Sequence, residues 1–181
     1  MKITEMKLPG VLLLTAKIYR DDRGEFAETF NLRAMSDAGL PTEWAQDNFS
    51  VSKKQVLRGI HYQVTQPQGK LVRVMYGAVL DVVVDLRRNS PNFSRHIGVE
   101  LNAESGDMLW IPPGFGHAFL ALSDKVGFAY KVTDYYSPAA ERTIRFDDPD
   151  LAIAWPIDAE QAIVSAKDRA GAALRDAEVF S

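Results

Sequence analysis

The chain has 181 residues, of which 46% are hydrophobic and 25% are charged, and its formal net charge is -3. A chain of this length buries roughly 70% of its unfolded surface, so it forms a core, and its apolar content excludes an intrinsically disordered protein. The absence of cysteine excludes disulfides, thiolate catalysis and cysteine-bound metal or iron–sulfur clusters. The slight acidity disfavours nucleic-acid binding but leaves local phosphate sites possible, and the length predicts a single globular domain over residues 1–181.

The N-terminal segment carries charges at Lys2, Glu5 and Lys7, where a secretory signal would have its apolar stretch. No later apolar run has the length that is needed to cross a bilayer. We therefore expect a cytoplasmic protein without a membrane segment.

Short segments rich in Val, Ile, Leu, Phe and Tyr alternate with Gly, Pro and Asn along the chain, which is typical of a many-stranded protein. The predicted strands are Val11–Ile18, Phe26–Phe30, Val56–Gln63, Leu71–Tyr76, Val79–Leu86, His96–Leu101, Asp107–Ile111, His117–Leu122, Gly127–Thr133 and Arg142–Phe146. Helical patterns occur only between Asn31 and Gly39 and in the tail, where Ser165 is placed to cap a helix running through Ala173. Strands and helices do not alternate, so the pattern predicts a mainly β sandwich or barrel.

The predicted strand Val79–Leu86 carries acids on one of its two faces. Alternate side chains share a face, so Leu80, Val82, Val84 and Leu86 form one side and Val79, Asp81, Val83 and Asp85 form the other. Either the two acids line a cavity inside the fold, or they face water on a half-exposed sheet. The strand pattern alone leaves both interpretations open.

Two of the three histidines lie in unusual strings. His61 follows Arg58 and Gly59 and precedes Gln63, and His117 follows a run of prolines and glycines. A single strand histidine is more often a hydrogen-bonded structural residue than a catalyst. Strict alternation places Arg58 and His61 on opposite faces, so a pocket that uses both requires a bulge or a strand end at Gly59.

The spacing of Gly106, Pro112, Gly114 and His117 resembles the second motif of the cupins, which are double-sheet β jelly rolls. In metal-binding cupins, the first motif supplies two histidines and a glutamate. Here His61 occupies the first histidine position, but Gln63 and Lys70 stand where the second histidine and the glutamate would be. A lysine in place of a carboxylate repels a divalent ion, so we expect no metal and no other cofactor.

Strings along nearly the whole chain resemble the dTDP-4-dehydrorhamnose 3,5-epimerases, a family of metal-free cupins that act on nucleotide-linked 4-keto-6-deoxy sugars. The matching strings are Asp22-Arg23-Gly24 with Phe26 and Glu28, Gln46 to Ser52, Arg58 to Gln63, Gln68-Gly69-Lys70, Asp81 to Arg87, Tyr130-Lys131 with Tyr136 and Pro138, and Ser165 to Asp168. The chain departs from the family pattern at Gly116-His117-Ala118-Phe119 and at Ser94-Arg95-His96. Neither departure removes a functional group.

The resemblance implies four catalytic roles. His61 is the base that removes a proton beside the keto group, and Asp168 is its partner, which holds the imidazole in place. Lys70 stabilises the enolate oxygen, and Tyr130 is the acid on the opposite face. One alternative stays open for Asp168, because Ser165-x-x-Asp168 is also a capping-box pattern in which the carboxylate serves the start of a helix.

The resemblance also implies the substrate contacts. Arg23 and Arg58 bind the pyrophosphate, Tyr136 stacks on the thymine, and Lys167 is a further substrate contact. Glu28, Gln46 and Asn48 bind the base and the deoxyribose, and a supporting pocket is formed by Asp81, His117, Phe26 and Phe119. The family forms homodimers in which the N-terminal segment 1–30 reaches the partner subunit, while the tail 158–181 packs on the barrel.

Two alternative functions stay open beside the double epimerase. One is a relative that inverts carbon 3 or carbon 5 alone, which the motifs do not distinguish because the shape of the pocket decides it. The other is a non-catalytic or metal-dependent cupin that binds a small molecule. Gln63 and Lys70 at the metal positions disfavour this second alternative.

Overall fold

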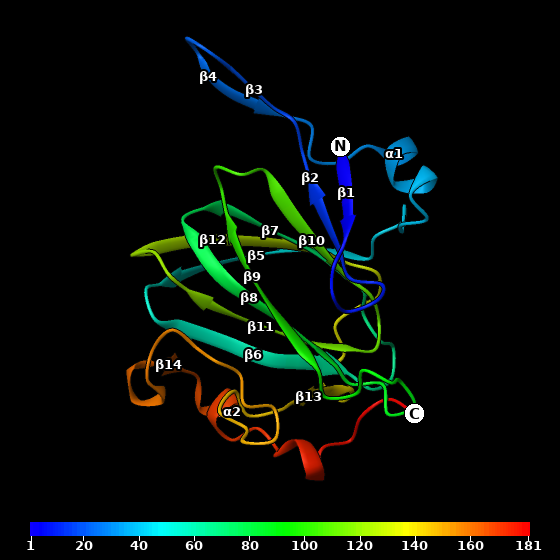
Figure 1. The fold of residues 1–181 in the computed structure, drawn as a ribbon, viewed down its shortest axis with the longest axis vertical. Helices are drawn as coiled ribbons and strands as arrows, with labels where there is room; N and C mark the ends of the chain where they lie inside the picture. The colour runs from blue at the N-terminus through cyan, green and yellow to red at the C-terminus, as the bar shows by residue number, and fades with distance from the viewer.

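The computed structural model describes residues 1–181, and it shows a double-sheet β jelly roll (Figure 1). The strands of the first sheet lie in the order β1 (Lys2–Glu5), β2 (Leu12–Thr15), β10 (Asp107–Ile111), β7 (Lys70–Tyr76), β12 (Lys125–Val132) and β5 (Gln46–Lys53). The strands of the second sheet lie in the order β13 (Glu141–Thr143), β6 (Val56–Gln63), β11 (Phe115–Ala121), β8 (Ala78–Asp85) and β9 (His96–Asn102). All these pairings are antiparallel, and the short β14 (Ile163–Val164) runs parallel to β6.

The space between the sheets holds the main core, which includes Val83 and Phe119 from the second sheet and Leu109 and Phe128 from the first. The opposite face of the second sheet is also covered. There Val82, Val84 and Leu86 pack against Leu151, Leu174 and Ala177 of the C-terminal segment. Both faces of β8 are therefore buried. Of the two interpretations left open, the one in which Asp81 and Asp85 face water is wrong, because both are 0% exposed.

The helices are few and short. The helix α1 (Leu32–Asp37) begins at Asn31, whose side chain accepts a hydrogen bond from the backbone N–H of Ala34, and its buried Met35 packs on the outer face of the first sheet. The C-terminal segment contains α2 (Ala166–Arg169) and the 3-10 helices η1 (Ala159–Gln161) and η2 (Leu174–Asp176). No helix is long and apolar enough to cross a membrane.

Several sequence predictions of element boundaries were wrong. The helix that was expected to run through Ala173 ends at Arg169, and the chain beyond it pairs with the segment after β13, where Arg145 donates its backbone N–H to the carbonyl oxygen of Ala172 at 3.0 Å. The expected strand Val11–Ile18 is divided, because β2 ends at Thr15 and Ile18 begins a separate two-stranded hairpin. The expected strands Phe26–Phe30 and Arg142–Phe146 are replaced by β4 (Gly24–Ala27) and by β13, which ends at Thr143. Strands β1, β5 and β14 were not predicted.

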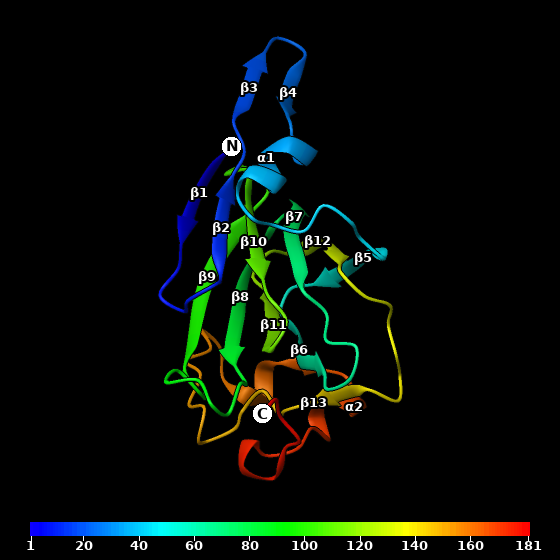
Figure 2. The same ribbon diagram turned by 90° about the vertical axis from the view of Figure 1, so that its right-hand side faces the viewer.

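That hairpin, formed by β3 (Ile18–Asp21) and β4 (Gly24–Ala27), projects beyond both sheets (Figure 2). Its two aromatic side chains lie in solvent, with Tyr19 54% exposed and Phe26 69% exposed. An isolated two-stranded hairpin is marginally stable in water, and large exposed aromatic side chains are typical of a surface that contacts another molecule.

Candidate functional site

The bulge expected at Gly59 is present and brings two candidate residues to one face. In the pairing of β6 with β11, His61 lies opposite His117 and Arg58 lies opposite Phe119, with a register shift between them. Gly59 has φ +115, and a Cβ there would lie 2.5 Å from the carbonyl oxygen of His117, so only glycine fits. Arg58 and His61 therefore both face the space between the sheets, although they are three residues apart.

His61 forms a close pair with Asp168, which lies on α2. The Nε2 atom of His61 is 2.7 Å from Oδ1 of Asp168, and Oδ2 of Asp168 accepts a hydrogen bond from the backbone N–H of Gly59 at 3.2 Å. Burial raises the pKa of Asp168, but the hydrogen bond and the charge of His61 outweigh this effect and lower it overall, so the carboxylate is ionised at neutral pH.

The helix cap and the histidine pair use different atoms of Asp168. Its backbone N–H donates to Oγ of Ser165 at 3.0 Å, which is the cap, while its carboxylate binds His61 and Gly59. The alternative in which the carboxylate serves only the start of the helix does not describe this arrangement.

Lys70 places a cation inside the barrel. Its side chain is buried, and Nζ donates to the backbone oxygen of His61 at 3.4 Å. Burial lowers the pKa of Lys70 to about 8, although the charges of Asp81 and Glu141 act in the opposite direction. The ammonium form therefore predominates at neutral pH, directly beside the histidine.

Gln63, at the second histidine position of the cupin motif, binds a neighbouring loop. Its Nε2 donates to the carbonyl oxygens of Gln66 at 2.8 Å and Tyr135 at 3.2 Å, and its Oε1 accepts from the N–H of Ser137 at 2.9 Å. The amide is thereby fully engaged with backbone groups. No group of three or more His, Asp or Glu side chains with metal-binding geometry occurs in the protein.

Tyr130 lies on the face of β12 that points between the sheets, as its alternation with Phe128 and Val132 predicted. Its ring centroid is 6.2 Å from that of Phe128, which stacks on Phe119 at 4.3 Å. Burial raises the pKa of Tyr130, so its phenol is protonated at neutral pH. The phenol is thus in the state that donates a proton.

A second histidine–carboxylate pair lies deeper in the barrel. Nε2 of His117 is 2.8 Å from Oδ2 of Asp81, and both side chains are buried. The other carboxylate oxygen of Asp81 has no hydrogen-bond partner. Asp85, on the same face of β8, accepts hydrogen bonds from Arg87 and Ser90 and so supports a turn.

The entrance to the site contains a network that the sequence analysis missed. Oε2 of Glu141 accepts hydrogen bonds from the phenol of Tyr136, at 2.7 Å, and from Nζ of Lys167. Oε1 of Gln46 accepts a bond from the backbone N–H of Tyr136. Glu141 belongs to none of the matched strings, so no motif pointed to it.

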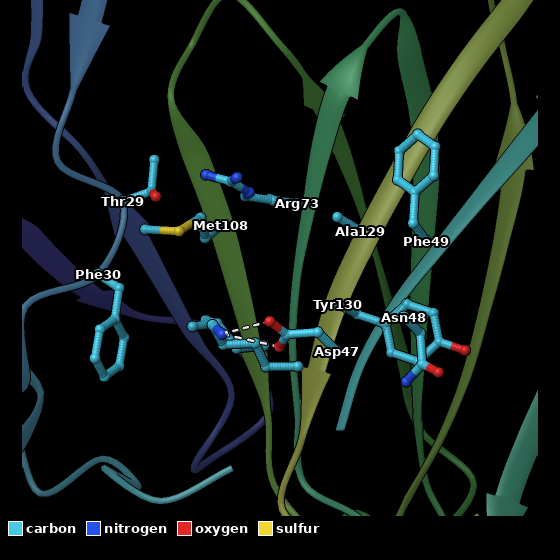
Figure 3. A pocket seen from close by; sticks show the side chains of 11 residues that line it. Thr29, Phe30, Asp47, Asn48, Phe49, Arg73, Met108, Ala129 and Tyr130 are labelled. Carbon is cyan, nitrogen blue, oxygen red and sulfur yellow. Dashed lines mark hydrogen bonds and ion pairs between the residues drawn. The ribbon is translucent and has the colours of Figure 1, made fainter. Parts of the chain in front are cut away.

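Two hollows flank these residues. One, of about 440 Å³, is lined by Arg58, His61, Lys167 and Asp168. The other, of about 410 Å³, lies mainly on the outer face of the first sheet, where it is lined by Arg73, Met108 and Lys131 and, from the segment after the hairpin, by Thr29 and Phe30 (Figure 3).

The N-terminal candidates are separate from His61 within one chain. Arg23 lies at the turn of the projecting hairpin, bonded to Asp21, and its side chain is 90% exposed. Phe26 lies on the same hairpin, and the exposed Glu28 follows it and accepts a hydrogen bond from Asn31. The site built by one chain therefore lacks these three predicted members.

Chemically, the arrangement combines a histidine held by a carboxylate, a buried ammonium and a protonated phenol, on different elements around one interior. Such a set suits removal of a proton beside a carbonyl, stabilisation of the resulting enolate and return of a proton from another group.

Comparisons with known proteins agree with this chemistry. A family profile described as dTDP-4-dehydrorhamnose 3,5-epimerase matches residues 5–176. The chain is 48% identical over 181 residues to a dTDP-4-dehydrorhamnose 3,5-epimerase of Pseudomonas aeruginosa, with 99% of both chains covered.

Solved structures of epimerases also match the fold of this chain. A dTDP-6-deoxy-D-glucose-3,5-epimerase of Legionella pneumophila in complex with dTDP-4-keto-L-rhamnose matches with a TM-score of 0.94 and 45% identity, over 98% of this chain and 94% of that one. A 3′-monoepimerase of Streptomyces bikiniensis in complex with dTDP-quinovose matches with a TM-score of 0.89 and 36% identity, over 94% of this chain and 87% of that one.

Proposed function

The chain belongs to the dTDP-4-dehydrorhamnose 3,5-epimerase family, and from this membership we infer its reaction. It is an isomerase that inverts carbons 3 and 5 of dTDP-4-dehydro-6-deoxy-D-glucose to give dTDP-4-dehydro-L-rhamnose. The structural observation that carries the mechanism is the 2.7 Å contact of His61 with Asp168, with Lys70 beside it.

The first step is removal of a proton. The 4-keto group acidifies the hydrogens on the two neighbouring carbons. Because Nε2 of His61 faces Asp168, the other ring nitrogen, Nδ1, is free to take the proton. The C–H bond breaks, its electrons move toward the keto oxygen, and the enolate that forms is stabilised by the ammonium of Lys70.

The second step returns a proton on the opposite face. The phenol of Tyr130 protonates the same carbon, the ketone re-forms, and the configuration is inverted. The imidazolium of His61 then releases its proton to solvent, and the phenolate of Tyr130 takes one up. Repetition at the other carbon completes the reaction, so no proton or electron is consumed overall.

The nucleotide half of the substrate is assigned to the residues at the entrance. Arg58 and Lys167 line the same hollow as His61 and carry the charge that a pyrophosphate requires. Tyr136 offers an exposed ring for the thymine, and Gln46 and Asn48 on β5 offer amides to the base and the deoxyribose.

A homodimer supplies the members of the site that one chain lacks. Arg23, Phe26 and Glu28 lie on or beside a hairpin that projects away from its own barrel (Figure 1). The outer face of the first sheet exposes Phe49, Val51 and Met75, an apolar surface that suits a subunit contact. In the proposed dimer, the hairpin of one subunit completes the site of the other.

Subunit mixing tests this exchange. His61→Ala and Arg23→Ala are each expected to lose activity alone, but a mixed dimer joins an intact barrel to an intact hairpin in one of its two sites. Random mixing is therefore expected to restore about a quarter of the wild-type rate. No restoration in mixed dimers that have been verified by mass would show that each chain uses its own hairpin.

Lys70 supplies a positive charge at the position where other cupins have a metal-binding carboxylate, so we propose that the enzyme acts without a metal. Activity is expected to survive treatment with a chelator, and loss of a stoichiometric metal together with activity would contradict this proposal. The cytoplasmic location expected from the sequence stays a prediction.

The configuration of the product tests the reaction itself. Incubation with dTDP-4-dehydro-6-deoxy-D-glucose, followed by proton NMR, is expected to show both carbons inverted. Because a 3′-monoepimerase shares this fold at 36% identity, inversion at one carbon alone after long incubation is the alternative outcome. That outcome would place the chain with the single-carbon enzymes.

A further inference from the structure

Glu141 occupies a central position that the proposed mechanism leaves unused. On β13 it lies opposite Gln63, and Thr143 of the same strand lies opposite His61, so Glu141 is on the site-facing side of the second sheet. Its side chain is only 14% exposed. It is a largely buried carboxylate at the entrance of a site that must accept an anionic substrate.

One carboxylate oxygen of Glu141 restrains two side chains. Oε2 accepts both the phenol of Tyr136 and the ammonium of Lys167. Burial raises the pKa of Glu141, but the bonds from Lys167 and Tyr136 outweigh this effect and lower it, so the carboxylate is ionised. The bond to Glu141 in turn raises the pKa of Tyr136, which keeps its phenol a donor.

Tyr136 is fixed separately at its backbone and at its ring. The backbone is held on one side by Gln46, which accepts from the N–H of Tyr136, and on the other by Gln63, which accepts from the N–H of Ser137. These two bonds leave the side-chain torsions of an exposed ring free. The phenol bond to Glu141 restrains the ring itself.

Tyr136 and Lys167 are the two side chains to which the proposed function assigns contacts with the nucleotide. A carboxylate repels a pyrophosphate, so Glu141 is unsuited to bind that part of the substrate. It is suited to order the two groups that do bind, since both Tyr136 and Lys167 are more than half exposed and would otherwise lose conformational freedom when the substrate arrives.

We propose that Glu141 is a positioning residue that orders the Tyr136 ring and the Lys167 ammonium for the dTDP half of the substrate. This inference rests on the proposed function for the roles of Tyr136 and Lys167. Beyond those roles, it assigns to the carboxylate of Glu141 the task of holding both side chains in position before the substrate binds.

The test uses Glu141→Gln, which keeps the size of the side chain and removes its charge, with dTDP as the ligand in calorimetry. The dissociation constant of dTDP is expected to rise about tenfold, because two charge-assisted bonds are weakened. KM is expected to rise by a similar factor, with kcat within about threefold of wild type. Glu178→Gln is the matched control, because Glu178 pairs with Arg142, the next residue on β13, away from the site.

A double-mutant cycle shows whether Glu141 acts through its two partners. In the background of Tyr136→Phe with Lys167→Met, the partners no longer respond to the carboxylate, so adding Glu141→Gln is expected to change dTDP affinity less than about twofold. If Glu141→Gln raises the dissociation constant of dTDP by the same factor in this background as in the wild type, the proposal is wrong. Unchanged dTDP affinity in Glu141→Gln with a lower unfolding temperature would overturn it as well, since that result describes a purely structural carboxylate.

Failure of the proposed function gives a different result. If wild-type protein does not bind dTDP, or if Tyr136→Phe with Lys167→Met binds it as tightly as wild type, the nucleotide roles of these residues are wrong. If the partner variant binds weakly and Glu141→Gln binds normally, only the inference about Glu141 is wrong.

Discussion

The protein contains two histidine–carboxylate pairs of nearly the same geometry in different surroundings. The pocket pair, His61 with Asp168, has a contact of 2.7 Å, and the buried pair, His117 with Asp81, has one of 2.8 Å. The side chain of His61 is 30% exposed and lines a hollow, whereas that of His117 is 9% exposed and stacks on Phe128. The distance between the partners does not separate a base from a structural pair, but access to a ligand does.

The two pairs are also assembled differently. The buried pair joins neighbouring strands of one sheet, so the sheet itself sets its geometry. The pocket pair joins a strand to the tail, and Asp168 depends on the Ser165 cap and on the N–H of Gly59 to hold its carboxylate in place. The pocket pair is thus the one that substitutions can misalign without unfolding the barrel.

The largest effect is expected from His61→Ala. Loss of general-base catalysis costs on the order of a hundredfold to ten-thousandfold in rate, and we expect solvent exchange and turnover to fall together. His117→Ala should leave far more exchange in the folded fraction, because that ring does not reach the hollow. Equal loss in both variants, with intact folds by circular dichroism, would remove the distinction between the pairs.

Asp168→Asn is expected to lower kcat by about a hundredfold, because the amide no longer stabilises the imidazolium that forms during proton removal. The backbone cap to Ser165 is retained, so the unfolding temperature should change little. A large loss of thermal stability with a wild-type rate would instead make Asp168 part of the helix start only.

Lys70 lies between the two pairs, with a hydrogen bond to the backbone of His61 and a favourable charge interaction with Asp81. Its ammonium is the active form, and its pKa is lowered to about 8, so kcat/KM should fall about tenfold per pH unit above that value. In Lys70→Arg the side chain stays charged, and this alkaline decline should move to higher pH. If the alkaline decline of kcat/KM is unchanged in Lys70→Arg, it reports the titration of a group other than Lys70.

The smallest effect on rate is expected from Asp81→Asn, which keeps a hydrogen-bond partner for His117. We expect kcat within about threefold of wild type and a loss of about 1–3 kcal/mol in the free energy of unfolding, since a buried charged hydrogen bond is weakened. Denaturant titration and steady-state kinetics measure the two quantities. A hundredfold loss of kcat at normal stability would show that the buried pair takes part in the chemistry.

The sequence predicted most of the second sheet, because alternation, glycine placement and the histidine strings all lie there, whereas the roles of Lys70, Tyr130 and Asp168 were implied by the family resemblance. The bulge at Gly59 followed from requiring Arg58 and His61 to share a face. Strand β5 was missed because its pattern is inverted, with polar Asn48 and Ser52 turned inward and Phe49 and Val51 turned outward. The segment alternates as a half-buried strand does, but its apolar side chains Phe49 and Val51 lie on the face turned away from the core.

Two contacts between distant segments were not predicted from the sequence. Glu141 meets Lys167 across 26 residues, and Gln63 binds the loop before β13 rather than a ligand. Neither contact corresponds to a motif of fixed spacing in the sequence, since each depends on how the tail and the 134–141 segment fold over the barrel. The motifs therefore pointed to the candidate reacting groups and to Asp168, and they missed Glu141.

The central claim is that base and acid are separate groups on opposite faces of the sugar, and deuterium incorporation in Tyr130→Phe tests it most directly. The aromatic ring is kept and only the proton donor is lost, so His61 can still form the enolate. In heavy water, we expect label to enter recovered substrate faster than inverted product forms, by mass spectrometry and proton NMR. Inversion at the wild-type rate, or equal loss of exchange and inversion in a folded variant, would contradict the assignment.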